Sequence, residues 1–141
     1  MRLYLRPRVW DAAGVVPLCS ALEGNAHVTE LVLSNNLLAN LPGTLGELQT
    51  LRLLDVSCNK LATIPESVGG LTALTHLSLA SNRVRKLPDS LCDAAELRRI
   101  EAYDNGLTEL PEDFGDLIKL NRLTLEGSNL VELPQSMGRM M

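Results

Sequence analysis

Residues able to do acid–base, nucleophilic or metal chemistry are few in this chain of 141 residues. It has two histidines, His27 and His76, and three cysteines, Cys19, Cys58 and Cys92. Their spacing fits no metal-binding or disulfide framework, and no phosphate-binding glycine loop or nucleophile elbow occurs. A nucleophile and its base must lie about 3 Å apart, whereas His76 and Cys58 are expected on the order of 15 Å apart on neighbouring strands. We therefore predict no enzymatic activity, no cofactor and no metal site.

The positions of the remaining polar residues follow from a 23-residue unit that recurs five times. Its first column is aliphatic throughout, with Val28, Leu51, Leu74, Leu97 and Leu120. Asparagine forms another column, with Asn36, Asn59, Asn82, Asn105 and, in the last unit, Ser128. A Leu-Pro or Ile-Pro step recurs at Pro42, Pro65, Pro88, Pro111 and Pro134. A fixed period in this range is typical of a repeat solenoid, so we predict one domain, 1–141, with repeats 1–27, 28–50, 51–73, 74–96, 97–119 and 120–141.

The unit reads L-x-x-L-x-L-x-x-N-x-L-x-x-L-P-x-x-L-G-x-L-x-x and resembles a leucine-rich repeat of the Leu-Pro type. Intracellular scaffolds of the scribble and erbin group and the plant Ras-group-related repeat proteins carry this variant. The resemblance implies an α/β fold, a right-handed leucine-rich repeat solenoid with about six parallel strands on its concave face. It also implies a non-enzymatic protein–protein interaction module, with small GTPases, phosphatases and kinases as the partner classes.

Within each unit the L-x-L core alternates apolar and polar residues, which indicates a short strand. Leu31 and Leu33 should point inward, and Val32 and Ser34 outward. The asparagine should satisfy backbone groups where the chain turns away, and the proline should open an irregular or 3-10 return on the convex side. Phe114 stands in a leucine column and is predicted to be core.

The first 27 residues follow a different pattern. Leu3, Leu5 and Trp10 match Leu31, Leu33 and Leu38 at a spacing of 28. Between them, Leu18, Ala21, Leu22, Asn25 and Val28 resemble the helical half of a ribonuclease-inhibitor-type repeat, which predicts one convex helix near the N-terminus. Trp10 should be core, Arg8 replaces the asparagine, and Pro7 would blunt the edge of the first strand. No polar cap is recognised at either end, so we expect a fragment or an uncapped array.

The outward columns of the strands form the predicted binding surface. Its candidate residues lie on or just after the last four strands and are Asp55, His76, Arg99, Glu101, Tyr103, Asp104, Arg122 and Glu126. Tyr103 is the strongest of them, because Tyr and Arg are enriched at binding hot spots. The alternative is a solvated face whose charges pair locally, Arg99 with Glu126 or Arg122 with Glu101.

Composition narrows the remaining choices. The net charge is −4, and no basic stripe flanks an aromatic platform, so nucleic-acid binding is not expected. No apolar run is long enough to span a membrane, and no secretory signal is recognised. The cysteines are predicted to be free thiols in a reducing, cytoplasmic setting.

Three functional hypotheses remain. The first is a rigid protein–protein interaction module, a scaffold in signalling that binds through its concave face. The second is a structural segment of a larger assembly, packing or self-associating through open ends. The third is a substrate-targeting domain of a multidomain signalling enzyme.

Overall fold

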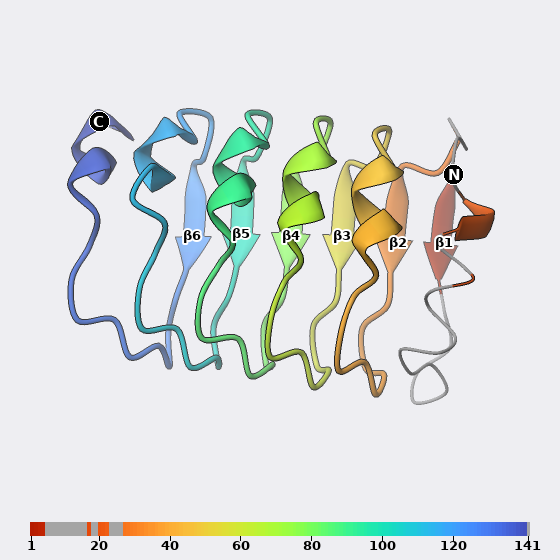
Figure 1. Cartoon of the computed structure of the whole chain (residues 1–141), viewed down its shortest axis with the longest axis horizontal. Helices are drawn as coiled ribbons and strands as arrows, with labels where there is room; N and C mark the ends of the chain where they lie inside the picture. Colours follow the sequence, from red (N-terminus) through yellow and green to blue (C-terminus); the bar gives the residue numbers. More distant parts are fainter. Residues whose placement is uncertain (5–16, 18–19, 23–26, 141) are drawn as a thin grey trace.

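The computed structural model describes residues 1–4, 17, 20–22 and 27–140. These residues form an elongated array in which each repeat contributes one strand to a sheet, and short helices lie in front of that sheet (Figure 1). The two ends of the chain lie at opposite ends of the array (Figure 1). The described part therefore confirms the predicted solenoid of parallel strands and short convex turns.

The sheet follows chain order, with every neighbouring pair parallel. Its strands in the described residues are β1 (Arg2–Tyr4), β2 (Glu30–Val32), β3 (Leu53–Asp55), β4 (His76–Ser78), β5 (Arg99–Glu101) and β6 (Arg122–Thr124). The pairing register equals the repeat spacing, for example Leu31 beside Leu54. Leu3 pairs with Leu31, which confirms the spacing of 28 for the first strand.

The return segments contain short 3-10 helices. They are η1 (Gly43–Glu47), η2 (Glu66–Gly70), η3 (Asp89–Asp93), η4 (Phe114–Asp116) and η5 (Gln135–Met140). The first three directly follow prolines with φ between −67° and −71°, because proline fixes φ and ends the extended segment. The helix η4 starts later and follows Asp113 instead.

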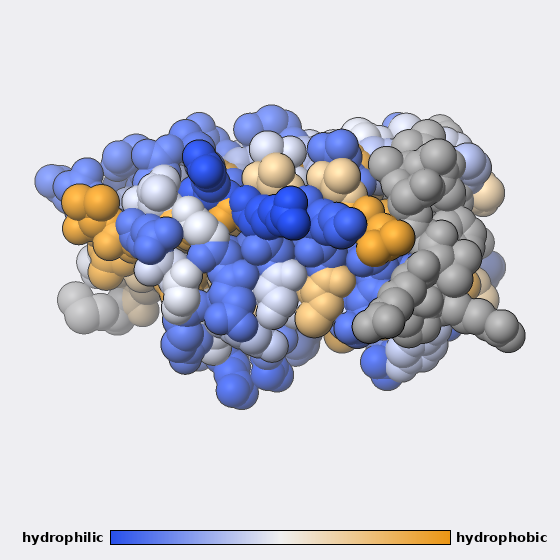
Figure 2. Space-filling view, turned by 90° about the horizontal axis from the view of Figure 1, so that it is seen from below, coloured by the Kyte–Doolittle hydropathy of each residue, from blue (hydrophilic) through white to orange (hydrophobic). Residues whose placement is uncertain are grey.

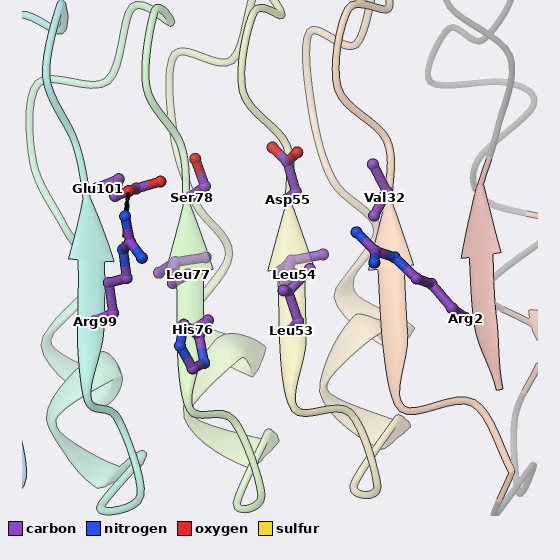
Figure 3. Close-up of a pocket in the computed structure, with 10 residues that line it drawn as sticks. All are labelled: Arg2, Val32, Leu53, Leu54, Asp55, His76, Leu77, Ser78, Arg99 and Glu101. Carbon is purple, nitrogen blue, oxygen red and sulfur yellow. Dashed lines mark hydrogen bonds and ion pairs between the residues drawn. The ribbon is translucent and has the colours of Figure 1, made fainter.

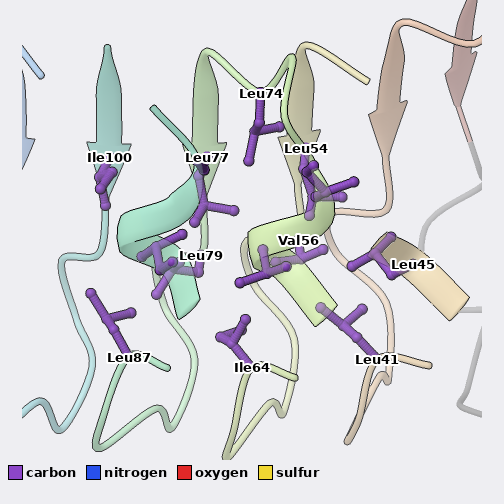
Figure 4. Packing of buried hydrophobic residues seen from close by; sticks show 14 of the residues in the cluster. Leu41, Leu45, Leu54, Val56, Ile64, Leu74, Leu77, Leu79, Leu87 and Ile100 are labelled. Carbon is purple, nitrogen blue, oxygen red and sulfur yellow. The ribbon is translucent and has the colours of Figure 1, made fainter. Parts of the chain in front are cut away.

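The core is aliphatic and runs along the whole array between sheet and returns (Figure 4). Leu31, Leu54 and Leu77 are at most 1% exposed, as the alternating pattern predicts. Phe114 is fully buried, which confirms its assignment to a leucine column. A single repeat cannot bury such a stripe, so stacking of neighbours supplies the hydrophobic stabilisation.

The asparagine column connects successive repeats through backbone groups. Asn82 Nδ2 donates to the carbonyl oxygens of Leu79 in its own repeat, at 2.9 Å, and Val56 in the preceding repeat, at 3.0 Å. Asn82 Oδ1 accepts the backbone N–H of Leu61 at 2.9 Å. The predicted support of the turn by asparagine is thus confirmed. The side chains of Asn59, Asn82 and Asn105 each bond to the backbone of the preceding repeat.

Several predictions near the N-terminus fall outside the described residues. Arg8, Trp10 and Pro7 belong to this group, as does the third N-terminal arginine, Arg6. Of the predicted convex helix, Pro17, Ser20 and Ala21 are α-helical. Leu22 lies in a turn and is buried, and the rest of that helix, with Cys19, lies outside the described residues.

Candidate functional site

The outward side chains of β2 to β6 form the face predicted to be concave, which we call the sheet face. Register places His76, Arg99 and Arg122 side by side at the strand starts. Asp55, Ser78 and Glu101 form the next column towards the strand ends. Tyr103, Asp104 and Glu126 follow β5 and β6 in the descending loops. The predicted residues therefore share one face but extend from β3 to the loop after β6.

Arg99 on this face pairs with a carboxylate of its own strand. Arg99 Nη2 lies 2.5 Å from Glu101 Oε1, and Arg99 Nε donates to the same oxygen at 2.9 Å. The predicted pairs, Arg99 with Glu126 and Arg122 with Glu101, were wrong. Two residues apart on a strand, Arg99 and Glu101 point to the same side of the sheet, so the long arginine side chain reaches its own-strand carboxylate.

Two candidate carboxylates have local structural roles. Asp55 Oδ1 accepts the Ser57 hydroxyl at 2.6 Å and the Ser57 backbone N–H at 3.0 Å, which supports the turn after β3. Asp104 has φ of 52°, a left-handed conformation that Asp tolerates better than most residues. Binding at either position would therefore compete with turn support.

His76 is held by its neighbour Thr75. The Thr75 hydroxyl donates to the Arg52 carbonyl oxygen at 2.9 Å and lies 2.8 Å from His76 Nδ1. A hydroxyl has one proton to donate. With that proton on the Arg52 carbonyl, Nδ1–H of His76 donates to Thr75 and leaves Nε2 available to a ligand.

A hollow of about 220 Å³ lies on the sheet face between β2 and β5 (Figure 3). Val32 and Leu53 add half-buried apolar surface to it, and Asp55 and Glu101 stand on either side of Ser78. Arg2 extends into this hollow from β1. Its Nε also forms an ion pair with Glu30 Oε2, at 2.8 Å. The sequence reasoning centred the site on β5 and β6 and omitted Arg2, Val32 and Leu53. The run of small outward residues in the middle repeats is the sequence signal that could have located this hollow.

Tyr103 is 40% exposed and available to a partner. Ala80, in the same outward column one strand away, is only 1% exposed. The sheet face therefore offers the exposed ring of Tyr103 to a partner, whereas the Ala80 position offers almost no accessible surface.

Comparison with known proteins gives the family. The family model described as leucine rich repeat matches residues 26–84. A leucine-rich repeat protein from Leptospira interrogans is 28% identical, with a TM-score of 0.69, and the match covers 97% of this chain and 39% of that one. Residues 26–84 therefore match the leucine-rich repeat family, and the chain has the leucine-rich repeat fold. No curated protein matches it.

A second leucine-rich repeat structure is the ectodomain of the plant membrane receptor kinase GASSHO1/SCHENGEN3 from Arabidopsis thaliana, in complex with CASPARIAN STRIP INTEGRITY FACTOR 2. It is 26% identical, with a TM-score of 0.73, over 84% of this chain and 15% of that chain. This leucine-rich repeat chain thus spans well under half the length of either structure. In the part described, no helix is long and apolar enough to cross a membrane.

The leucine-rich repeat fold is typically a non-enzymatic interaction module, and leucine-rich repeat domains generally mediate protein–protein interactions. The described residues contain no group of three or more His, Cys, Asp or Glu able to hold a metal. Burial raises the pKa of the Cys92 thiol to about 11, with Asp113 adding to the effect. A thiol with so high a pKa remains protonated at neutral pH and is a poor nucleophile.

Proposed function

We propose that this chain is a non-enzymatic protein-binding module that engages its partner through the sheet face. The hollow across β2–β5 carries the proposal, because it combines apolar surface, charged groups and an adjacent exposed Tyr103. Binding hot spots are enriched in Tyr and Arg around such desolvated centres. The resemblance to Leu-Pro repeats suggests a small GTPase, phosphatase or kinase as partner, in a cytoplasmic signalling scaffold or a targeting domain.

The test compares the wild type with an Arg99→Ala, Glu101→Ala, Tyr103→Ala variant in affinity capture from the source cell. The matched control is Lys60→Ala, Arg83→Ala, Arg85→Ala, which removes exposed residues that follow β3 and β4. Figure 2 views the array from the side on which the strands end, and hydrophilic residues cover most of the middle of that side. A partner that is retained by the control and lost from the sheet-face variant supports the proposal. Partners retained equally by all three proteins would contradict it.

The last repeat favours a second function, packing of the array through its C-terminal end. Leu133 is 58% exposed, whereas Leu87 and Leu110 in the same column are 0% and 6% exposed. Leu130 is only partly buried, while Leu107 is fully buried. Apolar side chains left open in this way favour association with another apolar surface.

Self-association distinguishes this second function from the first. Sedimentation over a range of protein concentrations should show oligomers that disappear in Leu133→Lys, if the end packs against another copy. Exposed Ile118→Lys is the control, because Ile118 lies outside the column. A monomer at every concentration, with sheet-face binding intact, would leave only the first function.

A further inference from the structure

A second hollow lies at the edge of the sheet where β3, β4 and β5 begin. Its volume is about 550 Å³, and it is lined by Arg52, Ala73, Thr75, His76, Glu96 and Arg98. This volume is within the range of small-ligand sites, roughly 300–1,000 Å³. Figure 3 shows His76 at the beginning of β4, where the sheet-face hollow and this edge meet.

Two arginines stand on either side of this hollow. Arg52 and Arg98 each precede a strand start and are two strands apart, about 10 Å at the usual strand spacing. Their backbones are fixed by the sheet, since Arg52 O accepts from His76 N at 3.0 Å and Arg98 O accepts from Arg122 N at 3.1 Å. Both side chains are exposed, and within the described residues neither makes an ion pair. Their guanidinium groups are thus available to a ligand.

The single carboxylate in the lining is already engaged. Glu96 accepts a hydrogen bond from Lys119 and forms an ion pair with it. The Lys119 hydrogen bond lowers the pKa of Glu96, and Arg98 contributes a smaller lowering. The negative charge of Glu96 is thus offset by Lys119, and the two arginines leave the hollow cationic.

The remaining lining adds polar groups and space. Ala73 is small, and Thr75 orients the His76 ring through the contact with Nδ1 at 2.8 Å. Arg side chains bind phosphoryl oxygens with paired N–H donors, which gives both strength and geometric selectivity. Two such groups facing one hollow match a doubly charged tetrahedral anion.

We propose that this hollow binds a phosphoryl group, with Arg52 and Arg98 as its ligands and His76 as a neighbouring ring that reports on binding. The hollow is larger than one phosphate, so a phosphorylated side chain enters together with part of its peptide. His76 also lines the sheet-face hollow, which lets one phosphorylated partner occupy both. Binding of the anion itself does not depend on that partner.

The test is a titration of the labelled protein with inorganic phosphate, followed by NMR. We expect saturable shifts in the Arg52 and Arg98 Nε–H signals and in the His76 ring, with affinity reduced about tenfold or more in Arg52→Gln, Arg98→Gln. The control is Arg83→Gln, Arg85→Gln, which removes two exposed arginines on the opposite edge and should change nothing. Unchanged circular dichroism and thermal midpoints should accompany both variants, because these side chains are exposed.

A second arm uses a serine-containing peptide with and without phosphorylation. Tighter binding of the phosphorylated peptide than of inorganic phosphate identifies a phosphorylated segment as the source, and equal binding identifies free phosphate. No saturable shift at the hollow up to about 20 mM phosphate overturns the proposal. Equal shifts at Arg83, or equal binding of the unphosphorylated peptide, also overturn it. None of these outcomes alters the sheet-face capture experiment, so the two proposals fail separately.

Discussion

Gly69 lies so close to Ser90 of the next repeat that a Cβ at position 69 would stand 2.5 Å from the Ser90 carbonyl oxygen. The same approach recurs at Gly46 and Gly115. Glycine at this column therefore lets successive 3-10 returns stack closely. Cys92 occupies the equivalent position in the fourth repeat, and the following return, η4, begins only at Phe114. The departure from glycine in the fourth repeat is thus followed by an altered return in the fifth.

We expect Gly69→Ala to lower the free energy of unfolding by about 1–3 kcal/mol, because the backbone of η3 must move away. Chemical denaturation measures the change. Gly43→Ala is the control, since nothing lies within 4 Å of a Cβ there. Equal stabilities for the two variants would show that the close approach is relieved at no cost.

Asn82→Ala should destabilise the protein by about 1–3 kcal/mol, because the Leu61 N–H and the Val56 carbonyl lose a buried partner. Thermal and urea unfolding report the change. Asn40→Ala is the matched control at an exposed position. A midpoint for Asn82→Ala equal to that of the control would contradict the role of the asparagine column.

Ser128 replaces asparagine in the last unit, and its Oγ is buried with no hydrogen-bond partner in the part of the chain described. By the repeat spacing, an amide at 128 would accept from Leu107 N–H, as Asn82 does from Leu61. We expect Ser128→Asn to stabilise the protein by about 1 kcal/mol. Ser128→Ala removes the unpaired hydroxyl without adding an amide. Its stability shows how much of the gain comes from no longer burying an unpaired polar group. A Ser128→Asn variant less stable than the wild type would show that the turn at Gly127 does not allow the hydrogen bonds that the other asparagines make.

Cys92 should react with iodoacetamide far more slowly than exposed Cys58 at pH 8. With a pKa of about 11, only about one Cys92 in a thousand is a thiolate at that pH. Its rate should rise with pH up to about 11. Mass spectrometry of the labelled Cys19→Ser background assigns each rate, and Cys58→Ser should remove the fast phase. Equal rates at pH 8 would contradict the burial of Cys92.

The sequence predicted the repeat, the register and the core because one period constrains all three. Residues such as Leu54 and Phe114 must face inward if every unit is to stack, and Asn82 must support the turn before each return. Left-handed residues before the asparagine column, including Cys58 and Ser81, were not predicted. Asn, Cys, Ser and Asp occupy that column in successive repeats, so no single residue type identifies its left-handed backbone conformation from the sequence.

The tertiary structure decided how the surface groups are combined. Arg99 pairs with Glu101 on its own strand rather than across strands, because side-chain reach selects among several carboxylates that the pattern leaves equivalent. The hollow containing Arg2 and Leu53 depends on side chains from five strands converging. Arg52 and Arg98 similarly meet at one edge only when the repeats stack. Periodicity specifies a solenoid because every repeat places its apolar residues at the same positions and so stacks on its neighbours in the same way. A binding site depends instead on outward residues that differ from one repeat to the next.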